Sequence, residues 1–420
     1  MKIMKVIFLT SVSTGVKLLS GLIINKFISL FIGPSGLALI GQFQNVSTII
    51  QTFSSAGLTN GVVKYTAESN VDRMLLWSTA IKITIFFSIL SGLILILFSG
   101  FFSSYFMGDV NLEYLFEIFG FTVILFSLNQ LLLAIISGLK RIKLYLLLSI
   151  IQSIYSLAFS VLLIIFFKLD GAMIAMITNQ SVVFFVLLFI LRKDDEIQIL
   201  QFALKKFDIL YAKKLLQFSM MAIVSVICIP VSTLIIRNYI GNNLSWDFAG
   251  YWQAVNYISS MYLLVISTVM TVYYLPRLSS AIEKKDLYKE IKSHSLVIVP
   301  LTILSAIIIF LLKEWIVVLL FSRDFFDMLV LFKFQLMGDV IKIIACLLSY
   351  VMLAKAMTKI FILTEIISGI SLTLLSILFF KTYGFIGLSY AFFINNLMYL
   401  CMMILIVYHY FRFNNDKVFV

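Results

Sequence analysis

Four charged residues lie inside long apolar stretches, where contact with a charged substrate or ion is possible: Lys17, Lys26, Asp339 and Lys342. A charge at the centre of a membrane-spanning helix costs about 2.5–3.5 kcal/mol even on the lenient insertion scale, so it normally faces a polar cavity or a partner. Lys17 shares a helical face with Thr14, whereas Lys26 falls on the opposite face, nearer the end of its segment. We expect Lys17 and Lys26 to contact substrate.

Asp339 and Lys342 are three residues apart, a spacing that brings two side chains together on a helix. Two interpretations are open. In the first, the residues form a mutually neutralised structural ion pair. In the second, Asp339 carries a coupling proton and Lys342 contacts the substrate in a cavity. Glu365, near the start of the next apolar segment, is expected to pair with Lys359.

Uncharged polar residues form a stripe along one helical face in each of two further apolar segments. The stripes are Gln44, Thr48, Gln51 and Ser55, and Gln253, Tyr257, Ser260, Ser267 and Thr271. Hydrogen bonds between packed helices explain isolated residues of this kind, at about 0.6 kcal/mol each. Stripes of this length favour a water-filled cavity, because a buried amide without a partner is costly in lipid. We expect substrate contacts from Gln44, Thr48, Gln51, Gln253 and Tyr257.

Catalytic and metal-binding patterns are missing from the sequence, so neither an enzyme activity nor a bound metal or cofactor is expected. There is no GxSxG, phosphate-binding loop or CxxC motif. His294 and His409 lack ligand spacing, and His294 is expected in a solvated loop. Cys228, Cys346 and Cys401 lie in apolar runs, which indicates packing residues rather than a disulfide framework.

The composition is that of an all-α integral membrane protein. Hydrophobic residues make up 62% of the 420 residues and charged residues only 12%, whereas a soluble domain has about 25% charged residues. A helix needs roughly 20 apolar residues to cross a bilayer. Twelve spans are predicted, at residues 10–32, 36–59, 76–99, 114–137, 144–167, 171–191, 216–237, 247–275, 296–313, 328–354, 360–380 and 384–411.

The basic residues flank these spans asymmetrically. Of the 32 Lys and Arg residues, 22 fall on one side, 5 lie within spans, and 5 fall on the other side, namely Lys168, Arg237, Lys313, Arg323 and Lys381. The positive-inside rule therefore predicts that both termini are cytoplasmic in a multi-pass protein of the bacterial inner membrane. The net charge of +12 follows from this topology and does not indicate nucleic acid as a partner.

The chain also looks duplicated. Gly138–Lys143 resembles Ala354–Lys359 at an offset near 215, and Lys168–Gly171 before span six resembles Lys381–Gly384 before span twelve. Six spans per half keep both halves in the same orientation, with a pseudo-symmetry axis along the membrane normal. The predicted parts are a six-helix lobe at 1–191, a cytoplasmic linker at 192–215 and a second six-helix lobe at 216–420.

Several segments carry a family resemblance. They are Ser13-Thr-Gly-Val-Lys17, Phe31-Ile-Gly-Pro-Ser-Gly-Leu37, Ala56-Gly-Leu-Thr-Asn-Gly-Val-Val-Lys-Tyr65, Ser245-Trp-Asp with Trp252-Gln253, Tyr274-Leu-Pro-Arg-Leu278 and Gln335-Leu-Met-Gly-Asp-Val-Ile-Lys342. Together they resemble the Wzx-type flippases, in the polysaccharide-transporter branch of the multidrug/oligosaccharidyl-lipid/polysaccharide (MOP) exporter superfamily. The likeness spans nearly the whole chain and is greatest to O-antigen and enterobacterial common antigen translocases.

The resemblance implies two six-helix lobes around a central cavity that work by alternating access, driven by a proton or sodium gradient. It implies that undecaprenyl-diphosphate-linked oligosaccharides of O-antigen type move from the cytoplasmic to the periplasmic leaflet. It also implies a cationic cavity for the diphosphate, to which Lys17, Lys64 and Lys342 would contribute. Close relatives often carry an arginine in span two where Phe43 is here followed by Gln44 and Asn45, which argues against a strongly acidic glycan. Membrane lipids and the polymerase and chain-length machinery of the pathway are the expected partners.

Three alternatives stay open. An ion-coupled drug exporter of the same fold would be expected to bury carboxylates rather than a lysine in the first lobe, and a shared fold does not determine function. A membrane-embedded polysaccharide polymerase or ligase would be expected to carry a long external loop with arginines, whereas the external connectors near 100–113 and 314–327 are short. Flipping of a peptidoglycan precursor is the third alternative.

Overall fold

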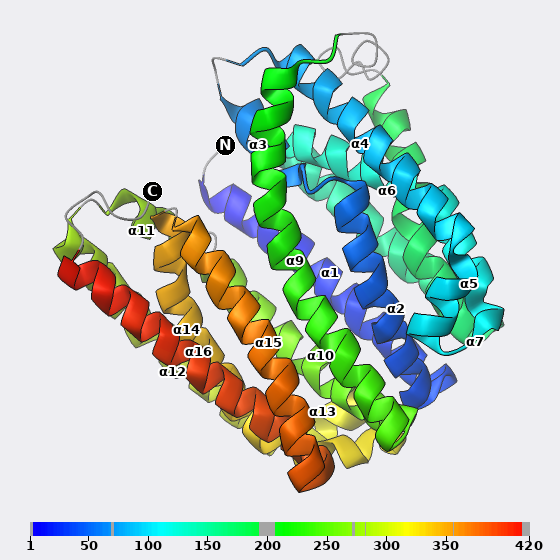
Figure 1. Ribbon diagram of the computed structural model, residues 1–420, viewed down its shortest axis with the longest axis vertical. Helices are drawn as coiled ribbons and strands as arrows, with labels where there is room; N and C mark the ends of the chain where they lie inside the picture. Colours follow the sequence, from blue (N-terminus) through cyan, green and yellow to red (C-terminus); the bar gives the residue numbers. More distant parts are fainter. Residues whose placement is uncertain are drawn as a thin grey trace. The chain divides into compact units, whose positions relative to one another are not determined.

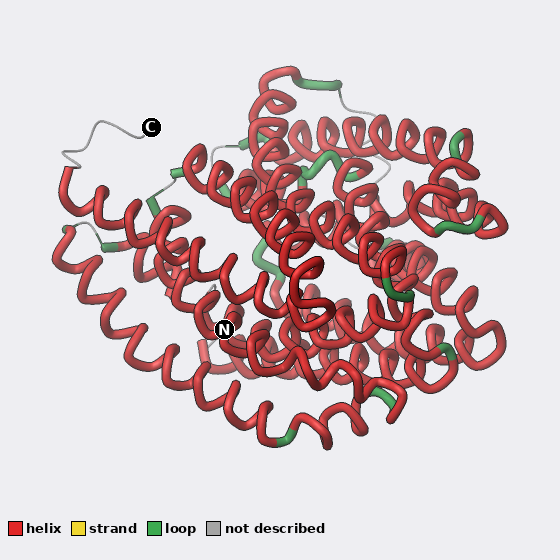
Figure 2. Tube along the Cα trace, turned by 60° about the horizontal axis from the view of Figure 1, so that its bottom comes forward, coloured by secondary structure: helices red, strands yellow, loops and turns green. Residues whose placement is uncertain are grey.

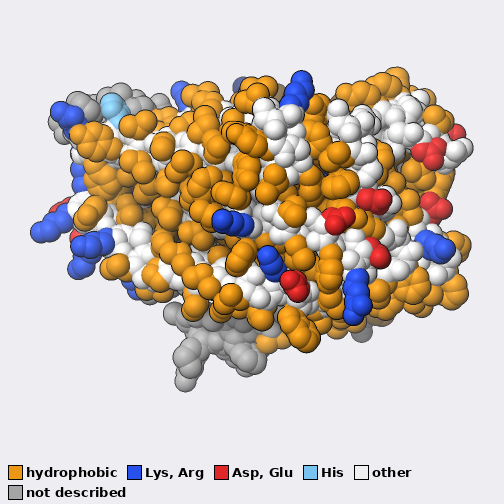
Figure 3. Space-filling model, turned by 90° about the horizontal axis from the view of Figure 1, so that it is seen from below, with side chains coloured by type: hydrophobic (Ala, Val, Ile, Leu, Met, Phe, Trp, Pro, Cys, Tyr) orange, Lys and Arg blue, Asp and Glu red, His pale blue; other side chains and the backbone are white. Residues whose placement is uncertain are grey.

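The computed structural model describes residues 3–68, 71–192, 206–270, 274–281, 283–355 and 357–413. These residues form helices and short connections, and none of them lies in a strand (Figure 2). Apolar side chains predominate on the face shown in Figure 3. The all-α fold expected from the composition is confirmed.

The chain divides into two compact units, and the first comprises Met1–Pro230. Its helices are α1 (Ile3–Phe31), α2 (Gly33–Ser54), α3 (Thr59–Ala67), α4 (Arg73–Leu97), α5 (Ser99–Phe102), α6 (Glu113–Gly138), α7 (Ile142–Leu191) and the first part of α9 (Ile209–Asn243) (Figure 1). One π-helical turn at Ser103–Met107 and one 3₁₀ turn at Val110–Leu112 precede α6. The backbone of α7 is interrupted at Lys168, where φ is 49° and ψ is −119°, so α7 supplies two spans.

The second unit comprises Val231–Val420. It contains the remainder of α9 and the helices α10 (Trp246–Val269), α11 (Leu275–Ser280), α12 (Lys284–Leu311), α13 (Lys313–Leu320), α14 (Phe332–Ala354), α15 (Thr358–Tyr383) and α16 (Gly387–Phe413). Two 3₁₀ turns lie at Arg323–Leu331 and Gly384–Ile386. The units meet in sequence at Pro230, which lies within α9. Most of the predicted linker, residues 193–205, falls outside the described residues.

A long helix lies at each of the twelve predicted spans when the two halves of α7 are counted separately. Seven stretches of the described chain are long and apolar enough to cross a bilayer, and two of these, Ile142–Leu191 and Thr358–Arg412, each contain two helices. The remaining three long helices are α2, α9 and α10. The predicted stripes lie on α2 and α10, and α9 carries a buried cation described below.

Two helices extend beyond their predicted ends. α9 runs to Asn243 instead of ending at residue 237, and α12 begins at Lys284 instead of residue 296. The added turns of α12 are rich in Lys, Glu and Leu, which are strong helix formers, and Leu287 on this segment is buried. The prediction of a solvated loop around His294 is therefore wrong, because His294 lies on α12 with only 9% of its surface exposed.

The duplication is visible in the backbone. Lys168 in the first unit and Gly384, 216 residues later, both have a positive φ, of 49° and 65°. Three residues after each stands a glycine, Gly171 or Gly387, where an added Cβ would lie 2.0 Å from a carbonyl oxygen of the preceding helix. Glycine is required at both positions because no side chain fits that gap. Lys168 thus corresponds to Gly384, not to Lys381 as the sequence comparison suggested.

The turns from α6 to α7 and from α14 to α15 repeat in the same way. Arg141 has φ −80° and ψ 57°, and Met357, 216 residues later, has φ −79° and ψ 56°. The amide of Arg141 donates to the Ile136 carbonyl at 3.2 Å, as the amide of Met357 donates to the Met352 carbonyl at 2.8 Å. The correspondence predicted between Gly138–Lys143 and Ala354–Lys359 is confirmed.

A side-chain contact is repeated as well. In the first unit the Asn179 amide donates to Ser156 Oγ, which joins the two halves of α7. In the second unit Ser371 Oγ on α15 donates to Asn395 Oδ1 on α16. Asn395 and Ser371 follow their counterparts by 216 and 215 residues. The two units are therefore pseudo-symmetric down to an interhelical polar contact.

Candidate functional site

The second unit contains a network of buried polar side chains on α9, α10 and α14. α10 contributes Gln253, Asn256, Ser259 and Tyr262, whose spacing of three residues brings them close to one helical face. α14 packs against α10 and contributes two further members of the network, Gln335 and Asp339. The network is interior to this unit, because Asp339 is fully buried and Gln335 and Ser259 are nearly so.

Asp339 is the acidic centre of the network. Its Oδ2 accepts hydrogen bonds from Ser259 Oγ at 2.6 Å and from Tyr262 OH at 2.9 Å. Its Oδ1 is buried and makes no hydrogen bond with any residue that the structure describes. A proton on Oδ1 would remove a buried charge while leaving both hydrogen bonds on Oδ2 intact. The site is therefore suited to binding and releasing a proton.

Gln335 connects Asp339 to the rest of α10. Its Nε2 lies 3.3 Å from Asn256 Oδ1 and 3.4 Å from Ser259 Oγ. One amide thus contacts two residues on successive turns of the neighbouring helix. Contacts of this kind restrict the rotation of α14 about its axis, because each buried amide must keep its partner.

Lys342 does not pair with Asp339 as the first interpretation of the sequence required. Within the described part of the chain Lys342 forms no ion pair, and its Nζ lies 6.0 Å from the ring centroid of Phe392 on α16. Asp339 is directed to α10 instead. The expectation that Glu365 pairs with Lys359 is also wrong, because Glu365 Oε1 accepts a hydrogen bond from Tyr399 OH on α16 at 2.8 Å and Lys359 is exposed.

Arg237 is a buried cation that sequence reasoning missed. It was expected in an external connector, but α9 continues past it and only 2% of its surface is exposed. Its Nη2 donates to Gln253 Oε1, and its guanidinium carbon lies 5.9 Å from the ring centroid of Trp252. The first strong turn signal after Arg237 is Gly241-Asn-Asn243. Extending the helix to that signal would have placed this arginine inside a span, where a charge indicates function.

The stripe predicted on α10 is only partly the face that makes the network. Gln253 belongs to it, whereas Tyr257 packs its ring 6.4 Å from that of Phe321. Ser260 is exposed, and Ser267 Oγ donates to the Leu264 carbonyl of its own helix. Thr271 lies outside the described residues. Asn256, Ser259 and Tyr262 were missed because a spacing of four, rather than three, was followed from Gln253.

The predicted site residues of the first unit lie at or near its surface. Lys17 and Gln44 are exposed, and Lys17 makes no hydrogen bond or ion pair with the described residues. Lys26 and Gln51 are half-buried, and Thr48 Oγ1 donates to the Gln44 carbonyl at 2.8 Å. Lys64 on α3 is exposed, with its Nζ 5.2 Å from the ring centroid of Tyr65. No item of the buried network described above is repeated among these side chains.

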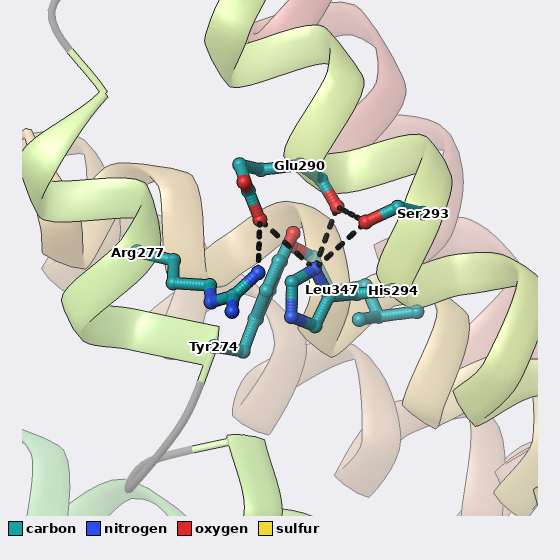
Figure 4. A network of polar contacts seen from close by, with 6 residues as sticks. All are labelled: Tyr274, Arg277, Glu290, Ser293, His294 and Leu347. Atoms are coloured by element: carbon teal, nitrogen blue, oxygen red, sulfur yellow. Dashed lines mark hydrogen bonds and ion pairs between the residues drawn. The ribbon is translucent and has the colours of Figure 1, made fainter.

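A second polar cluster holds α11 against the helices around it (Figure 4). Tyr274 OH, just before α11, donates to the Leu347 carbonyl on α14 at 3.0 Å. Glu290 on α12 lies 3.8 Å from Arg277 on α11, and His294 Nδ1 lies 2.8 Å from the Glu290 carbonyl oxygen. These contacts involve one carboxylate and one histidine. No group of three or more potential metal ligands occurs among the residues that were searched, which are the described ones.

Comparison with known proteins agrees with this architecture. The chain is 27% identical over 402 residues to the lipid III flippase of Escherichia coli (strain K12), with 95% of this chain and 96% of the relative covered. The lipid III flippase of Shigella flexneri matches to the same extent. These matches run through both units.

Solved structures show the same fold. An inward-facing multidrug resistance MATE family transporter of the MOP superfamily superposes with a TM-score of 0.75 at 13% identity, covering 93% of this chain and 94% of that one. A lipid II flippase in an inward closed conformation superposes with a TM-score of 0.72 at 17% identity, covering 96% of this chain and 87% of that one. The fold is thus that of multi-pass membrane transporters.

The family of polysaccharide biosynthesis proteins matches residues 3–282, which include the whole first unit and part of the second. This match covers more than half of the 420 residues. The chain is a multi-pass, all-α membrane protein and belongs to the polysaccharide biosynthesis protein family.

Proposed function

We propose that this protein is a flippase that moves undecaprenyl-diphosphate-linked oligosaccharides of O-antigen type from the cytoplasmic to the periplasmic leaflet of the inner membrane. The observation that carries the proposal is the full-length similarity to lipid III flippases, which covers 95% of this chain. Transport proceeds by alternating access and not by covalent chemistry. The polyprenyl tail stays in lipid, whereas the diphosphate and the sugars need hydrated, polar partners.

The orientation follows from the basic residues. Because Arg237 lies inside α9, the external side retains only Lys168, Lys313, Arg323 and Lys381 against 22 basic residues on the other side. The positive-inside rule then places both termini in the cytoplasm. The connection from α14 to α15, with Lys355 and Lys359, is cytoplasmic in this arrangement, and the end of α9 at Asn243 is periplasmic.

Substrate binding is assigned to both units. Lys17 is the principal cation for the diphosphate, because it is exposed and has no partner among the described residues. Lys64 and Lys342 supply further positive charge. The remaining contacts come from Lys26, Gln44, Thr48, Gln51, Gln253 and Tyr257.

Asp339 couples transport to a proton gradient. It is fully buried, it accepts two hydrogen bonds on one carboxylate oxygen, and its other oxygen has no partner among the described residues. No metal or organic cofactor is required for this role. The product, a lipid-linked repeat unit in the periplasmic leaflet, is the form that a polymerase with its chain-length machinery would use, so these proteins and membrane lipids are the proposed partners.

A second candidate function is transport of lipid III itself, because both named relatives are lipid III flippases. Expression in two host strains separates the candidates. One strain lacks its O-antigen flippase and the other lacks its lipid III flippase. Restoration of surface O-antigen supports the first function, and restoration in the other strain alone supports the second. Restoration in neither strain, with the protein present in the membrane, would contradict both.

A further inference from the structure

The second unit contains a second membrane carboxylate that the proposed function does not use. Glu365 lies seven residues inside α15, about 10 Å from the start of that helix at 1.5 Å per residue. Its Oε1 accepts a hydrogen bond from Tyr399 OH at 2.8 Å, and Tyr399 is buried on α16. A carboxylate held inside a membrane helix by one hydroxyl is a functional candidate by default, because its charge is expensive there.

Lys342 lies between Glu365 and Asp339. It stands on α14 three residues after Asp339 and four residues before Cys346. Lys342 is within electrostatic range of Asp339, and Lys342 and Glu365 are both within electrostatic range of the Cys346 thiol. Lys342 makes no ion pair with either carboxylate within the described chain. One cation is thus shared by two acids instead of neutralising one of them, an arrangement that a purely structural ion pair would not need.

These groups extend the network of α9, α10 and α14 along the length of the unit. Asp339 lies 15 residues from the end of α14 at Ala354, about 22 Å along the helix. Glu365 lies about 10 Å from the same side of the unit. Beyond Asp339, the polar contacts continue through Ser259 and Gln335 to Asn256. Glu365 is therefore the acid of this line that lies nearest the proposed cytoplasmic side.

The first unit has no equivalent acids or base. The residues 216 positions before Asp339, Lys342, Glu365 and Tyr399 are Val123, Phe126, Ser149 and Val183. The corresponding helices have the same turns and the same interhelical contact in both units. The fold itself therefore does not require charges at these four positions, and their presence in the second unit indicates a task specific to that unit.

We propose that Glu365 is the cytoplasmic exchange group for the proton that Asp339 carries. The proposal rests on the coupling role of Asp339. The proton leaves Asp339 Oδ1, passes through water alongside Lys342 to a carboxylate oxygen of Glu365, and is released to cytoplasmic water. Asp339 ends ionised, Glu365 returns to its ionised form, and Lys342 keeps its charge. The water is needed because the two acids are separated by about 12 Å along the helix axes.

The test uses the purified full-length protein in proteoliposomes. The probe is a fluorescently labelled undecaprenyl-diphosphate-linked oligosaccharide, and an internal pH dye reports proton movement. Each variant is measured with an imposed proton gradient and again without one, when the probe only equilibrates between leaflets. Glu365→Gln removes the exchange group, and Tyr399→Phe removes only the hydroxyl that holds it. Glu314→Gln, an exposed carboxylate on α13, is the matched control.

We expect Glu365→Gln to slow gradient-driven transport about a hundredfold, the lower end of what a positioned proton-transfer group contributes. Equilibration without a gradient should change less than twofold, Tyr399→Phe should show a smaller loss in the same mode, and Glu314→Gln should match the parent. Equal loss in both modes, or an unchanged gradient response, would overturn the proposal. If Glu365→Gln does not fold, Glu365→Asp and Tyr399→Phe decide the matter by the same criterion.

Asp339→Asn is measured in parallel to separate the two proposals. Gradient-driven transport by Asp339→Asn would remove the coupling role of Asp339, and the exchange role of Glu365 with it. Loss of coupling in Asp339→Asn together with a normal gradient response in Glu365→Gln would reject the role of Glu365 alone. The flippase function itself fails only if the parent protein does not move the probe in either mode.

Discussion

The two units share a backbone plan but differ in where they keep their charges. Both contain the same pair of turns and the same polar contact between their last two helices. The first unit presents Lys17 at its surface, whereas the second buries Arg237 and Asp339 in a hydrogen-bonded network. A duplicated membrane fold can therefore keep its turns, which the backbone requires, while the polarity of corresponding helix faces diverges. The predictions below test whether that divergence divides the labour of transport.

The largest effect is expected from Arg237→Ala. It leaves a cavity and removes the donor to Gln253, so we expect a loss of about 3–5 kcal/mol of stability, as for breaking a buried polar pair, and loss of transport. Thermal unfolding in detergent and complementation measure the two effects. The matched variant is Asn25→Ala, because Asn25 lies six residues before the end of α1 as Arg237 lies six before the end of α9. Equal stability of both variants would remove the contrast between the units.

Asp339→Asn should abolish gradient-driven transport while protein abundance stays normal. The amide keeps the shape of the carboxyl group and an acceptor for Ser259 and Tyr262, but it cannot exchange a proton. Exchanging the residues, as Asp339→Lys with Lys342→Asp, should not restore function, because the two side chains form no ion pair. Rescue by the exchange, read from surface polysaccharide and immunoblots, would reinstate the structural ion pair.

Lys17→Ala should lower export about tenfold, the equivalent of about 1.4 kcal/mol, without loss of folded protein. The reason is that Lys17 is exposed and supports no contact within the described residues. Lys17→Arg should retain part of the activity, since the charge matters more than the shape of the group for a diphosphate held through water. Surface glycan at native expression level is the measurement, and normal export by Lys17→Ala would dismiss the substrate role.

The smallest effect is expected at the turn within α7. Lys168 has φ 49° where its counterpart Gly384 has φ 65°, and a non-glycine residue in this region costs about 1–3 kcal/mol. Lys168→Gly should therefore raise the stability of the protein by about 1 kcal/mol. Leu169→Gly, one residue on, should lower it. A lower unfolding temperature for Lys168→Gly would show that the two turns are not equivalent.

Much of the fold could be predicted from the sequence. Each apolar run of sufficient length became a helix, and the echo between Gly138–Lys143 and Ala354–Lys359 marked a true repeat. Errors arose at the polar ends of the helices. Arg237 and His294 were excluded from their helices because a charged or titratable residue was taken to mark a span end, and packing of the added turns decided otherwise.

The sequence by itself determined that the chain is a duplicated set of membrane helices, because an apolar segment in lipid must satisfy its backbone hydrogen bonds internally. Only the tertiary structure decided which polar side chains meet. Asp339 stands one turn from Lys342 in sequence, yet it binds Ser259 and Tyr262 on another helix. The physical reason is that the rotation of each helix about its axis is set by packing against its neighbours, and the spacing of residues along one helix does not contain that information.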